Sequence, residues 1–265
     1  MEKNKTNKAN RKVSGRHIFA VLIVVFVIAG GIAAYNLIMS ERNYSSAQNE
    51  YADLRQYAPP AVSVSDNNEN NDSNDPTTPE PAPEAETETT HDLTEINPDY
   101  IGWIRIDGTE IDYPIVHGVD NEKYLDMTFT GERNRSGTIF MDAECRNGFS
   151  FFSILHGHNM RDGSMFAGLK RFLDNDFRAN HPEITIITYE NNVLIYNIFA
   201  VKITNVSDSI FDLPIKGNDA VADYFEEFGF SAQNLQDDLD ILVLATCSDG
   251  SRSDRLLVLA ARNRH

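Results

Sequence analysis

The chain has 265 residues and a formal net charge of −17, with 40 acidic against 23 basic side chains and two cysteines. This acidity argues against a nucleic-acid binder, which needs a basic face to neutralise phosphates. Two cysteines are too few for a disulfide scaffold, and the sequence contains no zinc, calcium-loop or phosphate-loop motif. We therefore expect neither a metal nor a cofactor. The length allows one large domain or two small ones.

The first predicted element is an apolar helix. Residues 18–39 carry no charged side chain, and residues 1–17 carry six basic residues against one acid. Twenty-two residues at about 1.5 Å each span about 33 Å, enough to cross a hydrocarbon core of ~30 Å. The basic flank predicts a cytoplasmic tail over 1–17, a single-pass transmembrane anchor over 18–39 and an exported remainder. A cleaved secretory signal is the alternative, but its apolar region is usually shorter.

Residues 40–90 predict a spacer between the anchor and a folded domain. The stretch 41–58 has helical composition and predicts a membrane-proximal helix. Residues 60–90 hold eight acids, five prolines and no basic side chain. Such a segment buries too little apolar surface to offset its ordering entropy, which predicts a disordered acidic stalk. The folded domain is predicted over 91–265, and removal of residues 1–90 is expected to leave it soluble and active.

The chain beyond residue 91 predicts a mainly β fold. Two stretches, 164–177 and 219–228, repeat apolar residues at helical spacing, the first with Asp162 or Ser164 as its N-cap. Helices do not alternate regularly with strands, so a closed eight-stranded β-barrel with added helices is expected rather than a doubly wound sheet. The eight predicted strands are short apolar runs bounded by turn residues, at 102–106, 111–115, 137–142, 151–156, 184–189, 193–203, 241–246 and 255–261.

Three residues that are capable of chemistry fall at the edges of these strands. Cys247 ends an apolar run, His158 follows a glycine after another, and Arg255 opens the last. A cysteine attacks as a thiolate, which a nearby imidazole or guanidinium favours. If the last two strands pair as a hairpin, Arg255 lies at the mouth of the same cleft as Cys247, where it can hold a carbonyl or oxyanion. Taken singly, each residue also has an ordinary structural interpretation.

Several separated motifs, in this order, resemble one known family. "GHNM" (157–160), "LATC" (244–247) and Arg255 before an apolar strand, on an exported and anchored barrel, are similar to sortases. The similarity is greatest to class B of these Gram-positive cysteine transpeptidases. It covers roughly Asp92 to the C-terminus and includes the stretches 96–125, 136–142 and 157–172.

The resemblance implies roles for five residues. Cys247 matches the nucleophile, His158 the general acid and base, and Arg255 the arginine that stabilises substrate and oxyanion. Thr246 and Asn159 are expected to contact the substrate.

The sequence departs from the family pattern at two positions near these residues. Val243 replaces the first Thr of a Thr-Leu-x-Thr-Cys motif, which removes a hydroxyl inside a strand. His156 stands where a Tyr is common and competes with His158 as the catalytic histidine; the position after glycine favours His158.

The loop after the cysteine offers one competitor for the arginine. Arg252 competes with Arg255 but lies in mid-loop. Ser248 and Asp249 follow the cysteine where some members of the family carry an acid.

The other cysteine, Cys145, is predicted to lie in a loop as an idle thiol. The alternative is a disulfide with Cys247, which export would permit and which would silence the enzyme. A nucleophilic Cys247 requires that this bridge is absent.

The resemblance implies a surface-exposed thiol protease or hydrolase that anchors proteins to the cell wall. It would cleave a Pro-x-Thr-type C-terminal sorting signal on secreted proteins and pass the acyl group to a peptidoglycan precursor amine. Two alternatives remain: a pilin-polymerising sortase that uses a pilin lysine, and a non-catalytic surface-displayed binding domain. A papain-like hydrolase is disfavoured because His158 precedes Cys247, and because Cys247 ends a strand rather than opening a helix.

Overall fold

The computed structural model describes residues 15–60, 93–230, 235, 238–248 and 253–264. Most of the predicted basic tail and nearly all of the predicted acidic stalk lie outside these residues, as do Arg252 and Asp249. The chain divides into two compact units, Met1–Ser45 and Ser46–His265.

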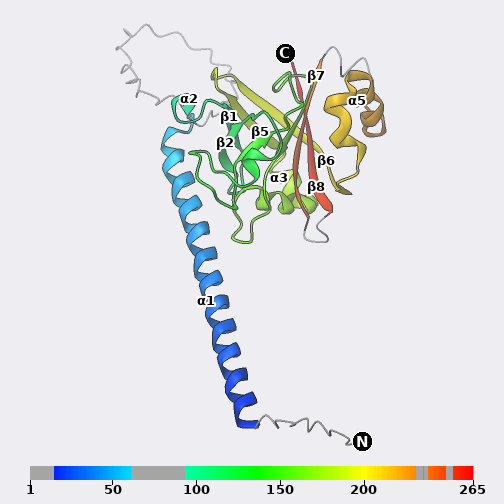
Figure 1. Ribbon diagram of the computed structural model, residues 1–265. Helices are drawn as coiled ribbons and strands as arrows, with labels where there is room; N and C mark the ends of the chain where they lie inside the picture. The colour runs from blue at the N-terminus through cyan, green and yellow to red at the C-terminus, as the bar shows by residue number, and fades with distance from the viewer. Residues whose placement is uncertain (1–14, 61–92, 231–234, 236–237, 249–252, 265) are drawn as a thin grey trace, which may run out of the picture. The chain divides into compact units, whose positions relative to one another are not determined.

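Eight strands in the second unit close into a barrel in the order β1-β2-β3-β4-β7-β8-β6-β5 (Figure 1). The predicted closed barrel is therefore confirmed, and each predicted strand agrees with the structure to within two residues. Two of the pairs, β2 with β3 and β4 with β7, are parallel. The strands are β1 Tyr100–Arg105, β2 Asp112–Val116, β3 Ile139–Met141, β4 Phe152–His156, β5 Glu183–Thr188, β6 Val193–Asn205, β7 Leu239–Cys247 and β8 Asp254–Asn263.

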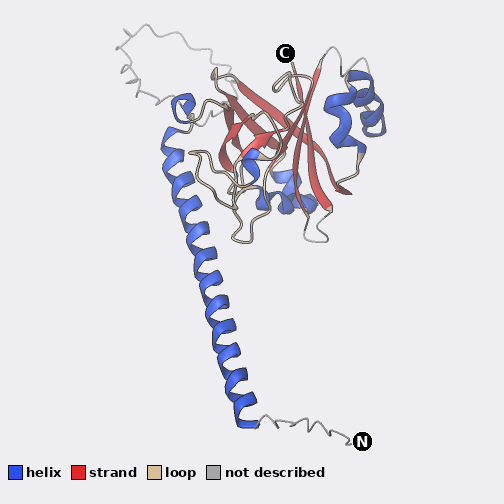
Figure 2. Cartoon of the chain, in the orientation of Figure 1, coloured by secondary structure: helices blue, strands red, loops and turns tan. Residues whose placement is uncertain are grey.

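Short helical segments precede the first strand and connect several of the later ones (Figure 2). Seven consecutive residues of β7 before Cys247 are buried, which requires cover on both faces of that strand. The helical segments of this unit that follow residue 92 are α2 Leu93–Ile96, η2 Lys123–Leu125, η3 Phe166–Leu173, α3 Asn175–Asn180, η4 Ser209–Asp212, α4 Leu213–Lys216, α5 Asn218–Phe225 and η5 Glu226–Phe228. The helical segment predicted at 219–228 is confirmed by α5 and η5.

The stretch predicted as one helix over 164–177 forms two segments, the 3-10 helix η3 and the short helix α3. The predicted N-caps Asp162 and Ser164 are wrong, because Met165 precedes η3 with a φ of 56° and no side chain caps that segment. Asp162 instead accepts the backbone N–H of Ser164. The side chain that does cap a helix here is Asp174, which accepts the N–H of Phe177 at the start of α3.

Helix α1 runs over Gly15–Leu54 and is followed by η1, Arg55–Tyr57. The predicted helix over 41–58 is thus confirmed. Among the described side chains of the first unit, large apolar residues are exposed, including Phe26 at 83%. Within the part of the chain that the structure describes, no helix has both the length and the hydropathy needed to cross a membrane.

The last two turns of α1 belong to the barrel unit and pack against it. Ala47, Tyr51 and Leu54 are each at most 3% exposed. The Tyr51 hydroxyl donates a hydrogen bond to the Gly137 carbonyl, and its ring meets that of Tyr113 edge-on at 5.2 Å. The compact unit that holds the barrel therefore begins at Ser46, and residues 46–57 cover part of the barrel. The expectation that residues 91–265 alone are soluble and active stays a prediction.

We expect a fragment of residues 46–265 to be markedly more stable than a fragment of residues 91–265. Tyr51 and Leu54 are both buried, and each large buried side chain contributes about 1.5–3 kcal/mol. Urea denaturation of both fragments measures the difference, with Tyr51→Ala in the longer fragment reproducing part of the loss. Equal midpoints for the two fragments would contradict this packing.

Candidate active site

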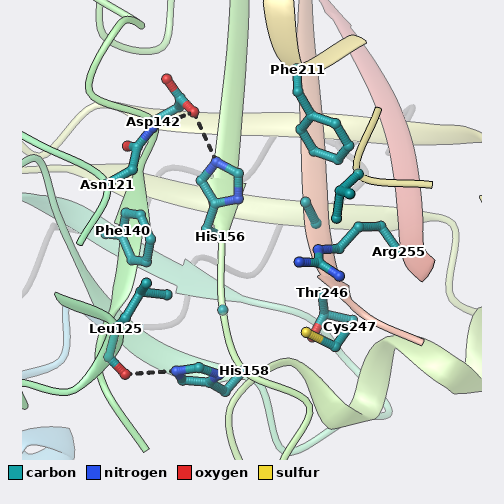
Figure 3. Close-up of a pocket in the computed structure, with 13 residues that line it drawn as sticks. Asn121, Leu125, Phe140, Asp142, His156, His158, Phe211, Thr246, Cys247 and Arg255 are labelled. Atoms are coloured by element: carbon teal, nitrogen blue, oxygen red, sulfur yellow. Dashed lines mark hydrogen bonds and ion pairs between the residues drawn. The ribbon is translucent and has the colours of Figure 1, made fainter. Parts of the chain in front are cut away.

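A pocket of about 350 Å³ opens where β4 and β7 end and β8 begins, and it contains the three residues singled out by the sequence. Cys247, His158 and Arg255 all line it. Figure 3 shows the Cys247 sulfur pointing toward the space between His158 and Arg255. The structure therefore brings the segment after β4, which carries His158, next to the β7–β8 hairpin, which carries Cys247 and Arg255 and lies far from it along the chain.

Cys247 is the last residue of β7, and its place follows from strand register. β7 and β8 pair antiparallel, with Cys247 opposite Arg255, as the predicted hairpin requires. While the preceding residues of β7 are buried, Cys247 is exposed and free. A thiol at this position is accessible to a substrate and has a permanent positive charge on the neighbouring strand.

The position of His158 is set by the residue before it, Gly157, whose backbone packs closely against two side chains. A Cβ on Gly157 would lie 2.5 Å from the Ile139 side chain and 2.7 Å from the Phe166 ring, so only glycine fits immediately before His158. The ring nitrogen Nε2 of His158 lies 2.7 Å from the Leu125 carbonyl. A carbonyl only accepts, so Nε2 carries a proton, and Nδ1 is the nitrogen available for proton exchange.

The loop after His158 is tied to the cysteine strand. The Asn159 side-chain amide donates to the Cys247 carbonyl at 2.9 Å, and the Phe166 N–H donates to the His158 carbonyl at 2.9 Å. Asn159 thus joins the histidine loop to β7; its predicted substrate contact stays a prediction. Thr246 also lines the pocket but is 2% exposed, and its hydroxyl finds no hydrogen-bond partner among the described residues.

Arg255 is the second residue of β8, and its guanidinium lies beside the Cys247 side chain in Figure 3. One of its nitrogens, Nη1, donates to the Asp254 carbonyl at 3.1 Å. A guanidinium carries five N–H donors and a permanent charge, which suit it to bind a substrate carbonyl or an oxyanion.

The competing histidine, His156, lies at the other end of the pocket. Its Nε2 is 3.0 Å from a carboxylate oxygen of Asp142, and Figure 3 shows the pair away from the Cys247 sulfur. This arrangement agrees with the choice of His158 as the general acid and base.

Cys145 is remote from this chemistry. It is 3% exposed, and its sulfur accepts the N–H of Ile154 at 3.4 Å. Burial raises the pKa of the Cys145 thiol to about 12. Both cysteines are free, so no bridge joins them in this structure.

We expect a methanethiosulfonate to label Cys247 and to leave Cys145 unmodified in the folded protein. At pH 8 a thiol with a pKa of about 12 is ionised to about one part in 10⁴, and reaction requires the thiolate. Peptide mapping by mass spectrometry locates the label, and denaturation provides the control by exposing both thiols. Preferential labelling of Cys145 in the folded protein would contradict the site.

Sequence reasoning missed the polar residues Asn121 and Asp142 and the aromatic residue Phe211, all of which line the pocket. They lie in the β2–β3 connection, after β3 and in η4. No fixed spacing relates these segments, so only closure of the barrel brings them together. Among the described residues, no group of three or more His, Cys, Asp or Glu side chains is arranged to hold a metal ion.

A free, exposed cysteine beside a histidine and an arginine, in a pocket of a closed barrel, defines a candidate thiol enzyme. The family model described as "Sortase domain" matches residues 104–263. The chain therefore belongs to the sortase family.

Its relatives are of the class B type. Sortase B of Listeria monocytogenes is 45% identical over 113 residues, which cover 42% of this chain and 45% of that protein, so the match spans less than half of the relative's length. A class B sortase of Streptococcus pyogenes involved in pilus biogenesis is 30% identical with a TM-score of 0.56, covering 66% of this chain and 97% of that one. The Staphylococcus aureus sortase B–substrate complex is 28% identical with a TM-score of 0.56, covering 65% and 84%.

Proposed function

We propose that this chain is a membrane-anchored cysteine transpeptidase that cleaves a Pro-x-Thr-type sorting signal near the C-terminus of secreted proteins. The acceptor is the amine of a cell-wall precursor. The observation that carries this proposal is the free, exposed Cys247 directly opposite Arg255 on the neighbouring strand, with His158 lining the same pocket.

The site can perform acyl transfer in two halves. The Cys247 thiolate attacks the Thr carbonyl carbon, and the resulting oxyanion accepts hydrogen bonds from Arg255. His158 gives a proton to the departing amine, the C–N bond breaks, and a thioacyl enzyme remains. The acceptor amine then attacks the thioester and loses a proton to His158, and the Cys247 thiolate leaves.

The anchor is part of the proposal and rests mainly on the sequence. Residues 18–39 have no charged side chain and follow a basic segment, which favours a cytoplasmic N-terminus and an extracellular barrel. The exposed apolar side chains of the first unit, Phe26 among them, are consistent with a helix that has lipid around it.

A second candidate acceptor is the lysine of a pilin subunit. The observation that favours it is the likeness to the Streptococcus pyogenes class B sortase involved in pilus biogenesis. The same Cys247 chemistry serves both acceptors, so the two candidates differ only in the second half of the reaction. A non-catalytic binding domain is the remaining alternative.

The test uses the full-length chain in detergent with a Pro-x-Thr-Gly peptide library and two competing acceptors, a wall-precursor amine and a lysine peptide. We expect cleavage between Thr and Gly and a new amide to the wall-precursor amine. If the new amide forms mainly with the lysine peptide, the acceptor is a pilin lysine rather than the amine of a cell-wall precursor. No cleavage of any peptide would contradict the enzyme and favour the binding domain.

A further inference from the structure

A second polar cluster occupies the pocket at the end away from Cys247 (Figure 3). His156 Nε2 lies 3.0 Å from Asp142 Oδ2, and the Asn121 amide donates to the same oxygen at 2.9 Å. Asp142 is 6% exposed, and the N–H of Glu144 donates to its other oxygen at 3.0 Å. None of these three side chains has a part in the acyl-transfer steps above.

The surroundings of Asp142 determine which nitrogen of His156 carries a proton. Burial disfavours the charged form of Asp142, but the hydrogen bonds from His156 and the Glu144 N–H outweigh it and hold the pKa of this carboxyl below its usual value. An ionised carboxylate only accepts, so His156 Nε2 must be protonated and donate. In the neutral form of such a ring, Nδ1 is the acceptor.

The ring is fixed so that Nδ1 faces the pocket. The rings of Phe140 and Phe211 flank it, with centroids at 5.2 Å and 6.4 Å. In Figure 3 the nitrogen remote from Asp142 points into the space between His156 and the Phe211–Arg255 side of the pocket. No described residue hydrogen-bonds to this nitrogen, and the His156 side chain is 22% exposed. A preorganised acceptor at the wall of a substrate pocket is a specificity element.

We propose that His156 reads the peptide substrate: its Nδ1 accepts a hydrogen bond from a side-chain amide N–H, so that one position of the sorting signal prefers an amide over a carboxylate. This inference rests on the proposed peptide substrate and names a residue that selects it. A carboxylate has no proton to offer Nδ1 and would also face the charge of Asp142. The other titratable or charged groups that line the pocket are Cys247, His158 and Arg255.

The test measures binding rather than turnover. Full-length protein carrying Cys247→Ala is titrated with Pro-x-Thr peptides in which each variable position is Gln, Glu or Met in turn. A hydrogen bond contributes about 1–1.5 kcal/mol, so at one position Gln should bind about tenfold more tightly than Glu or Met. His156→Phe, which keeps a flat ring, should reduce that preference to less than about twofold.

Two further variants distinguish a hydrogen bond to His156 Nδ1 from a general change in the shape of the pocket. Asp142→Asn removes the anion that fixes the tautomer, so it should lower the preference for Gln over Glu while the ring remains. His181→Phe makes the same histidine change outside the pocket and should keep the full preference.

The inference is overturned if no position distinguishes Gln from Glu and Met, or if His156→Phe leaves the preference unchanged. Cleavage by the chain with Cys247 intact is scored separately. Binding that depends on His156 without any cleavage would mean that the transpeptidase proposal fails while the reading by His156 stands.

Discussion

Replacing Cys247 by alanine is expected to abolish acyl transfer, with a fall in kcat/KM on the order of 10⁴-fold or more, because Cys247 is the one thiol among the described residues that line this pocket. The fold should persist, since Cys247 is exposed at the end of β7 and the strand pairing involves only its backbone. Peptide cleavage and thermal unfolding of the full chain measure the two effects.

The matched control for this change is Cys145→Ala, which alters the thiol that lies outside the pocket. It should retain acyl transfer. Full activity in Cys247→Ala would exclude Cys247 as the nucleophile, and loss of the fold in that variant would instead make it a packing residue.

Replacing His158 by alanine is expected to have the next largest effect, a loss of about 10²–10⁴-fold in kcat, because the departing amine loses its proton donor. The fold should again persist, since Gly157, rather than the His158 ring, makes the close approaches to Ile139 and Phe166. Single-turnover kinetics with the peptide identified in the library measure kcat apart from binding.

His156→Phe is the comparison for His158→Ala. It should change KM and the preference among peptides far more than kcat, since His156 is bound to Asp142 at the other end of the pocket. A larger loss of kcat in His156→Phe than in His158→Ala would reverse the assignment of the two histidines.

Local patterns were sufficient to predict the strands and one contact of the site. Hydrophobic residues alternate or cluster within each short run of the sequence, so each strand can be predicted without its neighbours. The hairpin between β7 and β8 follows from adjacency in the chain, and it places Cys247 opposite Arg255.

Features that depend on distant segments were not predictable in the same way. The segment 46–57 has helical composition, but nothing in it shows that Tyr51 bonds to the Gly137 carbonyl, 86 positions away. The contact between Asp142 and His156 needs the antiparallel pairing of β3 with β4, which no local pattern specifies. The N-caps Asp162 and Ser164 were predicted wrongly for a similar reason. Met165 precedes η3 with a positive φ, which its residue type does not favour, so nothing in the sequence indicated that the segment begins there.

The most direct test of the transpeptidase account is the intact mass of the full-length chain during turnover of a cleaved peptide without an acceptor amine. The account predicts a covalent adduct on Cys247 with the mass of the peptide fragment that ends in Thr, which hydroxylamine or an acceptor amine releases. It also predicts that the adduct is absent in Cys247→Ala. Cleavage without any adduct, or an adduct that persists in Cys247→Ala, would contradict the account.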